Sequence, residues 1–259
     1  MILRRMGNKA KIAKEMLKYF PNHKIYIEPF FGAGGMYFNK PKAKLNILND
    51  LDSDVFNLFN VVMNQKEELK KAFYMMPIHI DLLKHWKKNK EDEPIKKALR
   101  FLFLSNLTFM GAGASLQLGS DNGKNQFYKD IDNTFDYLQN TKFDNSDFKE
   151  FLNKHIAFGS SGFSCSTGDC FIYCDPPYLG TDDNYSNSFN EDNSNDLFDC
   201  LVETECKFAM SEFDHPFIIE QAEKRGLNVI IIGERKNLKN TRTEILITNY
   251  ENKQQSLFA

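Results

Sequence analysis

The stretch Cys170-Phe171-Ile172-Tyr173-Cys174-Asp175-Pro176-Pro177-Tyr178 decides the fold of this chain. Its first five residues form a short apolar run, which is typical of a buried strand. Because proline lacks a backbone N–H and fixes φ, the two prolines require the strand to end at Asp175. The sequence therefore predicts a carboxylate at the carboxyl edge of a sheet, where open α/β sheets bind their ligands.

The residues that follow this strand suit the binding of a planar base. Asp175 supplies a hydrogen-bond acceptor, the prolines supply a rigid turn with carbonyl oxygens, and Tyr178 supplies a flat ring. Such groups can hold a nucleobase by its exocyclic amine. The alternative is a turn that ends a strand and carries a solvated aspartate. The rest of the chain decides between the two.

Strand-like apolar runs alternate with helical patterns on both sides of this stretch. The predicted strands cover residues 25–27, 45–48, 155–158, 170–174, 207–210, 228–232 and 244–248. A helical pattern follows Gly7-Asn8-Lys9 as far as Pro21, and another begins at Ser53, the expected N-cap. The alternation predicts an α/β fold with a largely parallel, doubly wound sheet.

The middle of the chain breaks this alternation. From about residue 60 to residue 150 it is rich in lysine and aromatic residues and has no clear buried strand. Short helices are expected around residues 80–86 and 95–103, and the glycines of residues 110–125 indicate a loop or hairpin. We therefore expect one domain from residues 1–58 and 151–259, and an inserted, mainly helical subdomain from residues 59–150.

Composition limits the classes of protein that fit. Of the 259 residues 42% are hydrophobic and the net charge is −2, which excludes global disorder and binding through bulk positive charge. A local basic cleft for nucleic acid is still compatible with this balance. The five cysteines show no C-x-x-C spacing, so we expect buried thiols and no metal site. With no apolar run of transmembrane length and no signal peptide, the protein is expected in the cytoplasm.

A glycine-rich turn forms the second candidate site. Phe31-Gly32-Ala33-Gly34-Gly35 follows the strand at residues 25–27, and Asp50 ends the next strand. Glycines let the backbone approach a ligand closely, and an acid at that place can accept hydrogen bonds from ribose hydroxyls. The spacing differs from the dinucleotide pattern G-x-G-x-x-G, which argues against a dehydrogenase.

Taken together, these blocks resemble the DNA adenine methyltransferases of the Dam type. The resemblance covers most of the chain outside the middle section and rests on motifs in the family's order: Gly7-Asn8-Lys9, Glu28-Pro29-Phe30-Phe31-Gly32-Ala33-Gly34, Asp50, Asp175-Pro176-Pro177-Tyr178 and the closing Glu244 to Tyr250. It implies a Rossmann-like methyltransferase sheet with one antiparallel strand near the C-terminus. It also implies S-adenosylmethionine as cofactor, and an inserted target-recognition subdomain that binds double-stranded DNA.

The resemblance also implies roles for individual residues. The catalytic set is Asp175, Pro176, Pro177 and Tyr178, and the cofactor-binding set is Lys9, Phe30, Phe31, Gly32, Gly34, Asp50, Phe163 and Asp175. Candidates for DNA contact are Lys9, Asn122, Lys124 and Tyr185. Asp175 and the Pro176 carbonyl would accept the two amine hydrogens, while Tyr178 would stack on the flipped adenine.

The sequence leaves alternatives open for the partner and for the substrate. A separate cognate restriction endonuclease is an expected partner, and the target sequence is open because the middle section lacks the pattern common in GATC-reading members. Related enzymes methylate cytosine N4, RNA adenine or protein glutamine, although Asp rather than Asn or Ser at position 175 favours adenine. An alternative function of another class is that of a DNA-binding module that keeps the fold but has lost catalysis. The intact Asp175, Tyr178, Asp50 and Gly32 argue against that class.

Overall fold

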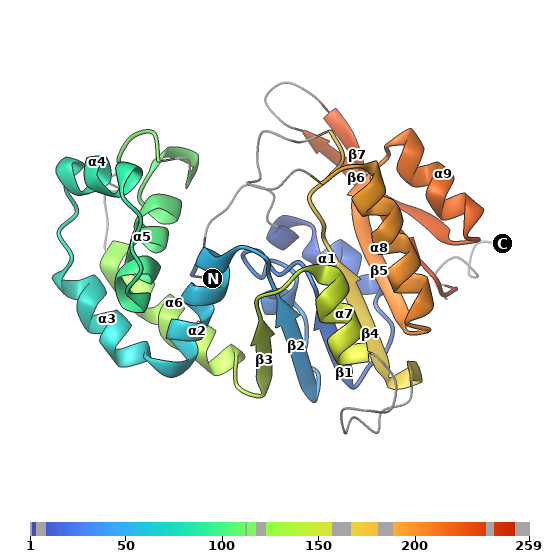
Figure 1. The fold of residues 1–259 in the computed structure, drawn as a ribbon, viewed down its shortest axis with the longest axis horizontal. Helices are drawn as coiled ribbons and strands as arrows, with labels where there is room; N and C mark the ends of the chain where they lie inside the picture. The colour runs from blue at the N-terminus through green and yellow to red at the C-terminus, as the bar shows by residue number, and fades with distance from the viewer. Residues whose placement is uncertain are drawn as a thin grey trace.

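A seven-stranded sheet forms the centre of the protein. The structure is a computed structural model that describes residues 2–3, 9–111, 113–117, 123–156, 167–180, 189–236 and 241–251. The strands lie in the order β3-β2-β1-β4-β5-β7-β6 (Figure 1). Their bounds are β1 Ile25–Glu28, β2 Leu45–Asn49, β3 Thr141–Asp144, β4 Cys170–Cys174, β5 Lys207–Phe213, β6 Asn228–Lys236 and β7 Thr241–Thr248.

The direction of the strands confirms the expected fold class. Neighbouring strands from β3 to β5 are parallel, whereas β7 is antiparallel to both β5 and β6. The chain thus has a mostly parallel α/β sheet with one antiparallel strand near its carboxyl end.

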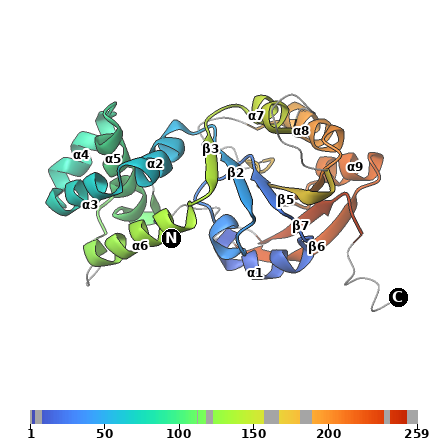
Figure 2. The ribbon, with the colours of Figure 1, turned by 90° about the horizontal axis from the view of Figure 1, so that it is seen from below.

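Helices cover both faces of the sheet and form a second body beside it. The α-helices are α1 Ala13–Met16, α2 Ser53–Asn64, α3 Lys66–Met75, α4 Ile80–Lys88, α5 Pro94–Asn106, α6 Gly123–Tyr137, α7 Phe148–Ile156, α8 Glu191–Glu203 and α9 Pro216–Lys224. Short 3₁₀ turns occur at Lys9–Lys11, Leu17–Tyr19, Tyr37–Asn39, Phe109–Gly111 and Thr167–Asp169. Helices α7, α8 and α9 lie on one face and α1 on the other, while α2 to α6 form the body at the edge next to β3 (Figure 2).

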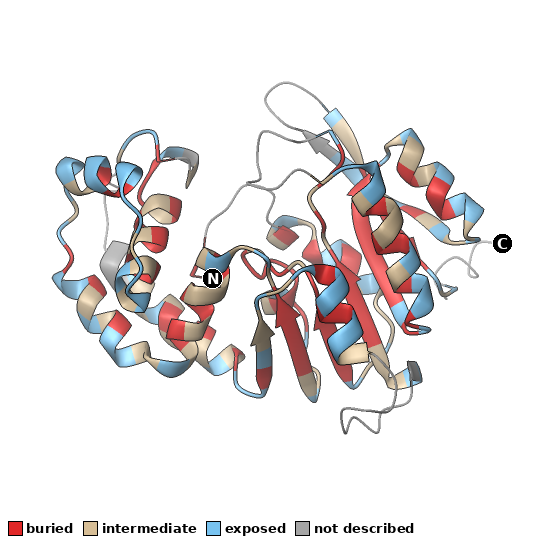
Figure 3. Cartoon of the chain, in the orientation of Figure 1, coloured by how far each residue is buried: buried red, intermediate tan, exposed pale blue. Residues whose placement is uncertain are grey.

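The sheet is buried from both sides, which explains the continuous apolar runs of its strands. Along β1 and β4, Ile27 and Ile172 pack under α7, α8 and α9, whereas Tyr26 and Phe171 pack toward α1. Burial is accordingly densest along the sheet and on the inward faces of the helices (Figure 3). Within the described ranges, no helix is long and apolar enough to cross a bilayer.

One strand lies where the sequence did not predict it. The strand expected at residues 155–158 is wrong for His155 and Ile156, which belong to α7, and residues 157–158 fall outside the described ranges. The sheet instead gains β3, which pairs in parallel with β2. As a result the sheet resumes at Thr141, within residues 59–150 that the sequence assigned to the insertion. Of the four residues of β3 only Thr141 is buried, so no apolar run marks this edge strand.

Candidate active site

Asp50 and Asp175 emerge at the same edge of the sheet. Strand β1 lies between β2 and β4, and Ile27 is in register with both Ile47 and Ile172. Continuing that register places both aspartates level with Phe30, on either side of β1. Adjacent strands lie about 4.8 Å apart, so about 10 Å separates the two chain paths. The two predicted sites are therefore neighbours.

The glycine-rich loop is held in shape by the end of β2. The Gly32 N–H donates to Asp50 Oδ2 at 2.6 Å, and the Phe31 N–H donates to the Asn49 carbonyl at 2.9 Å. Gly32 and Gly34 have φ of +56° and +70°, a region that side chains with a Cβ rarely adopt. Asp50 thus orders the loop itself, besides its predicted role toward a ribose.

The two phenylalanines of this loop have different surroundings. Phe31 is 2% exposed, and its ring packs edge-to-face against Phe59 and Phe143 in the core. Phe30 is half-buried beside Phe148 and Phe189, at the carboxyl edge. Phe30 is therefore the ring of the pair that lies nearer the surface, whereas Phe31 supports the loop from beneath.

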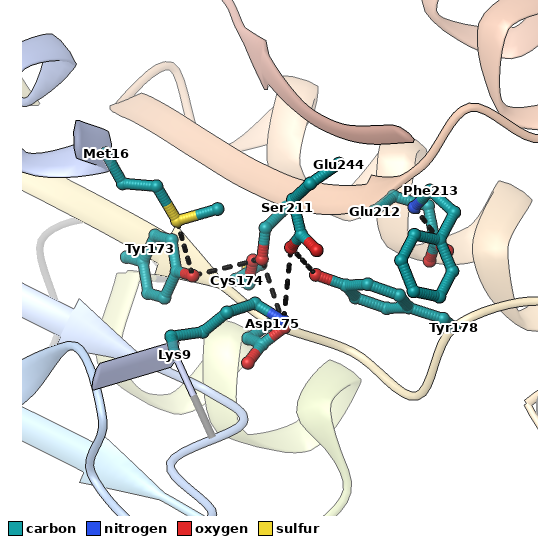
Figure 4. A network of polar contacts seen from close by, with 10 residues as sticks. All are labelled: Lys9, Met16, Tyr173, Cys174, Asp175, Tyr178, Ser211, Glu212, Phe213 and Glu244. Carbon is teal, nitrogen blue, oxygen red and sulfur yellow. Dashed lines mark hydrogen bonds and ion pairs between the residues drawn. The ribbon is translucent and has the colours of Figure 1, made fainter. Parts of the chain in front are cut away.

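Asp175 is oriented by neighbours from two other parts of the chain. Ser211 Oγ of β5 donates to Asp175 Oδ1 at 3.0 Å, and Lys9 Nζ lies 2.9 Å from the same oxygen (Figure 4). Ser211 Oγ is also 3.0 Å from the hydroxyl of Tyr173, and both of these residues are fully buried. With 22% of its side chain exposed, the carboxylate is fixed on one side and open on another.

Lys9 lies at the centre of the polar network in Figure 4. Its side chain is 4% exposed, and its ammonium is 3.2 Å from Glu244 Oε1 as well as close to Asp175. The same nitrogen lies 4.3 Å from the centroid of the Tyr178 ring. Burial of an ammonium is costly without partners, and here two carboxylates and a ring face supply them.

Tyr178 is packed from several sides. Its hydroxyl donates to Glu244 Oε1, its ring meets Phe213 edge-to-face at 4.6 Å, and 8% of the residue is exposed. Burial, followed by the negative charge of Asp175, raises the pKa of the phenol well above its usual value. Tyr178 therefore stays protonated and acts as a donor to Glu244.

Two further carboxyl groups lie buried near this edge. Burial raises the pKa of Glu212 to about 9, and its Oε1 accepts the Phe213 N–H. Burial also raises the pKa of Glu28 well above its usual value, and Asp175 and Asp50 add to the rise, although Tyr26 donates a hydrogen bond to Glu28 that opposes it. Glu212 is therefore protonated at neutral pH and adds no charge beside Asp175, and burial disfavours the charged form of Glu28.

The structure brings together only part of the predicted site. Lys9, Asp175 and Tyr178 contact one another or share a partner, Pro176 is buried and Pro177 half-buried behind them, and Gly32, Gly34 and Asp50 form the neighbouring loop. Phe163, Asn122 and Tyr185 lie outside the described residues, and Lys124 is in α6 with a side chain that is likewise not described.

Sequence reasoning missed Ser211, Glu212 and Glu244 as members of the site. A signal was present, because Ser211 and Glu212 are polar residues inside the otherwise apolar run from Phe208 to Phe213 of β5, and both are buried. Polar side chains in such positions need partners, and perturbed carboxyl groups gather at functional sites. Among the described residues there is no group of His, Cys, Asp and Glu side chains that could hold a metal ion.

Comparison with known proteins identifies similar sequences. A family model described as D12 class N6 adenine-specific DNA methyltransferase matches residues 6–245. The DNA adenine methylase of Haemophilus influenzae is 30% identical over 189 residues, which cover 66% of this chain and 61% of that protein. The DNA adenine methylase of Escherichia coli K12 is 24% identical, with 86% of this chain and 84% of that protein covered.

One further sequence and one solved structure are similar to this chain to different degrees. The Type II methyltransferase M1.LlaDCHI of Lactococcus lactis subsp. cremoris is 25% identical, with 95% of this chain and 94% of that protein covered. Among solved structures, the rRNA methyltransferase aviRa from Streptomyces viridochromogenes covers 95% of this chain and 85% of that chain at 11% identity, with a TM-score of 0.41. A structural likeness this weak supports no statement about substrate.

Proposed function

This chain belongs to the D12 class of N6 adenine-specific DNA methyltransferases, and we propose that it transfers a methyl group from S-adenosylmethionine to the N6 amine of an adenine flipped out of duplex DNA. The observation that carries the proposal is the position of Asp175. Its oriented, partly open carboxylate lies one strand away from the glycine-rich loop that Asp50 holds.

The loop has room for the methyl donor that this family requires. A Cβ built at Gly32 meets no atom within 4 Å, so the backbone there faces open space. Asp50 would accept hydrogen bonds from the ribose hydroxyls, and Phe30 would line the adenine part of the cofactor site. When bound, S-adenosylmethionine supplies a sulfonium methyl group, which is the electrophile of the reaction.

Asp175 would prepare the adenine amine for attack. The lone pair of the N6 nitrogen is delocalised into the ring, so acceptors must hold its two hydrogens to make the nitrogen pyramidal. Both described partners of Asp175 contact Oδ1, and we assign Oδ2 and the Pro176 carbonyl to the amine. Holding the amine and the methyl donor in line further lowers the barrier to transfer. The proton of the amine would then pass to Asp175 or to water.

The helical body would supply contact with DNA. Helices α2 to α6 lie at the edge next to β3, beside the carboxyl ends of the strands (Figure 1). We propose that the inserted region, within residues 59–150, reads the base sequence. Its Asn122 and Lys124 would contact the DNA. Lys9 and Tyr185 would contact DNA from the side of the sheet. Tyr178 would stack on the flipped base, which offsets an unstacking cost of about a few kcal/mol.

Asp175→Ala is expected to abolish methyl transfer, because the amine loses its acceptor, while S-adenosylmethionine still binds. Asp169→Ala is the matched control, since Asp169 directly precedes β4, at the end of the strand opposite to Asp175, and pairs with Lys24. Transfer of radiolabelled methyl groups to unmethylated DNA gives the activity, and calorimetry gives the cofactor affinity. Turnover by Asp175→Ala would refute the assignment.

The chemical identity of the product tests the base. Wild-type enzyme and unmethylated DNA are expected to yield N6-methyladenine after digestion to nucleosides. Finding N4-methylcytosine instead would replace adenine by cytosine as the target. Mapping the methylated positions in DNA from cells that express the chain gives the recognition sequence.

A further inference from the structure

The hairpin of β6 and β7 extends past the edge of the sheet where the catalytic motif lies. Continuing the register from β4 through β5 to β7 places Asp175 two residues short of the level of Glu244. Strand β5 ends at Phe213, opposite Glu244, whereas β6 and β7 stay paired for three residues more. Arg242 is therefore four residues further out than Asp175, which is about 13 Å along the strands.

Arg242 lies on the face of the hairpin that is turned toward the motif. Glu244, two positions along β7 and so on the same face, accepts the hydroxyl of Tyr178. The Arg242 guanidinium lies over the Phe213 ring, with its Cζ 5.2 Å from the centroid, and its Nη2 donates to the Gly180 carbonyl at 3.5 Å. Phe213 in turn meets the Tyr178 ring edge-to-face (Figure 4). A single ring thus separates the guanidinium from Tyr178.

The positive charge of Arg242 has no carboxylate partner among the residues that the structure describes. Its side chain is half-buried and contacts a carbonyl and an aromatic ring. The helices differ in this respect, because Arg100 lies 3.7 Å from Asp54 and Arg225 lies 2.6 Å from Asp199. A guanidinium carries several N–H donors in a planar fork that matches the oxygens of a phosphate. Most of these donors remain for a ligand.

The proposed mechanism directs the phosphates of the target nucleotide toward this hairpin. In adenine the N6 amine and the N9 atom that carries the ribose lie at opposite ends of the purine. A base held at Asp175 by its amine, with its ring on Tyr178, therefore points its ribose outward. Flipping rotates a nucleotide about its backbone, which takes the flanking phosphates out of their duplex positions. A fixed cation at the outer side of Tyr178 can hold such a phosphate.

We propose that Arg242 binds one of the two backbone phosphates that flank the flipped adenine, and so holds the target nucleotide in its extruded position. This inference rests on the proposed function, because the flipped adenine determines where those phosphates lie. The local charge supports it. Residues 234–243 contain four basic residues and one acidic residue, although the net charge of the whole chain is −2. A phosphate contact positions the DNA without reading its sequence.

A single neutral phosphate tests the contact. Duplexes that contain the mapped methylation site carry one methylphosphonate on either side of the target adenine, or at a distant position as control. Binding is measured with S-adenosylhomocysteine, so that no turnover occurs. At one flanking position wild type is expected to lose at least about tenfold in affinity, the factor that a lost charge-assisted hydrogen bond represents. Arg242→Met should bind the unmodified duplex more weakly and lose nothing further from that methylphosphonate, because two groups in contact are coupled.

The salt dependence of binding separates a phosphate contact from a purely structural role. One lost phosphate contact lowers the slope of log Kd against log salt concentration by about 0.9, and this is expected for Arg242→Met. Arg242→Lys should keep the slope and lose part of the affinity, because lysine keeps the charge but lacks the fork. Lys207→Met is the control, since Lys207 is exposed at the opposite end of β5, and it should change neither quantity.

The proposal is overturned by an unchanged salt slope for Arg242→Met, or by equal methylphosphonate penalties in wild type and Arg242→Met at both flanking positions. Melting temperatures report folding of the variants. If Arg242→Met does not fold, Arg242→Lys is measured with the same duplexes, where a smaller penalty than that of wild type is expected and an equal one overturns the contact. Wild-type enzyme that forms N6-methyladenine without this coupling refutes the role of Arg242 alone, whereas the absence of N6-methyladenine refutes the proposed function.

Discussion

At the scale of single residues, burial decides which carboxyl groups of the site carry charge. Asp175 keeps 22% of its side chain exposed and pairs with Lys9, whereas Glu212 is 1% exposed and has a pKa of about 9. A protonated Glu212 can lie near Asp175 and Glu244 without repelling them. The protonated Glu212 therefore adds no negative charge to the edge of the sheet where Asp175 lies.

The raised pKa of Glu212 predicts a dependence of stability on pH. Between the ordinary glutamate pKa of 4.5 and the folded value of about 9, the unfolded chain loses a proton that the folded chain retains. Folding therefore takes up a proton, and the free energy of unfolding falls as pH rises through this window. Glu212→Gln lacks the titration, so its stability relative to wild type should rise with pH by at most about 1.4 kcal/mol per unit.

Urea unfolding at about pH 5 and about pH 8 measures this difference, because linear extrapolation gives the free energy of unfolding at each pH. Glu234→Gln is the control, since Glu234 is exposed on β6. A constant gap between Glu212→Gln and wild type at both pH values would contradict the assignment of a buried, protonated acid.

The glycine-rich loop predicts unequal costs for two similar substitutions. Gly32 and Gly34 both have positive φ, so alanine at either position costs about 1 kcal/mol in backbone strain. A Cβ at Gly34 would also collide with Phe38 and lie 2.6 Å from Phe31 Cζ, whereas at Gly32 it meets nothing within 4 Å. Gly34→Ala should therefore destabilise by about 3 kcal/mol or more in urea unfolding. Equal losses for the two variants would refute this packing argument.

The residues that the sequence correctly brought to one edge of the sheet all lie in local motifs. The residues in question lie in short segments where glycine or proline indicates a turn after a strand: Asp175, Tyr178, Gly32 and Asp50. The structure brings these segments to one edge of the sheet. Glu244 became part of the site through a strand that returns between β5 and β6. Its contact with Tyr178 spans 66 positions, and no local pattern announces such a contact.

At the scale of elements, long amphipathic segments were predictable and short edges were not. Helices α4 and α5 and most strands were expected near their observed places, since apolar periodicity records which face is buried. Strand β3 was not predicted because only one of its four residues is buried, and only the end of α7, at His155 and Ile156, was predicted as part of a strand. The lysine-rich α3 buries only Leu69 and Phe73, which is too sparse a stripe to predict.

The start of α2 shows how one residue can shift a boundary. Ser53 was the expected N-cap, but the cap is Asp52, whose carboxylate accepts the Asp54 N–H at 2.9 Å. Ser53 is the first helical residue and accepts a hydrogen bond from Lys97 instead. An aspartate is as good a cap as serine, so the choice between adjacent polar residues depends on where the chain turns after Asp50.

This boundary predicts different effects for adjacent alanine substitutions. Asp52→Ala removes the cap and should cost about 1 kcal/mol of stability in urea unfolding. Ser53→Ala loses an exposed contact with Lys97 and should stay within about 0.5 kcal/mol of wild type. Asp52→Asn is the matched control, because asparagine also caps helices. A larger loss for Ser53→Ala than for Asp52→Ala would restore the serine as the cap.

At the scale of the whole molecule, the helical body and the sheet share one core. Phe59, Leu102 and Ile131 of the body belong to the same buried cluster as Tyr26 and Leu48 of the sheet. Polar contacts add to this continuity. The Tyr37 hydroxyl, just after the glycine-rich loop, donates to the Tyr137 carbonyl at the end of α6. The two bodies in Figure 2 are therefore joined by packing as well as by the chain.

The shared core predicts that both bodies unfold in one transition. The single tryptophan, Trp86, lies in α4 of the helical body, is 5% exposed and contacts Phe103 edge-to-face, so its fluorescence reports that body. Far-UV circular dichroism reports the whole chain. Coincident transitions in urea are the test of two-state unfolding, and we expect both signals to have the same midpoint. Trp86→Phe identifies the tryptophan signal, and an earlier fluorescence midpoint would mean that the helical body unfolds independently of the sheet.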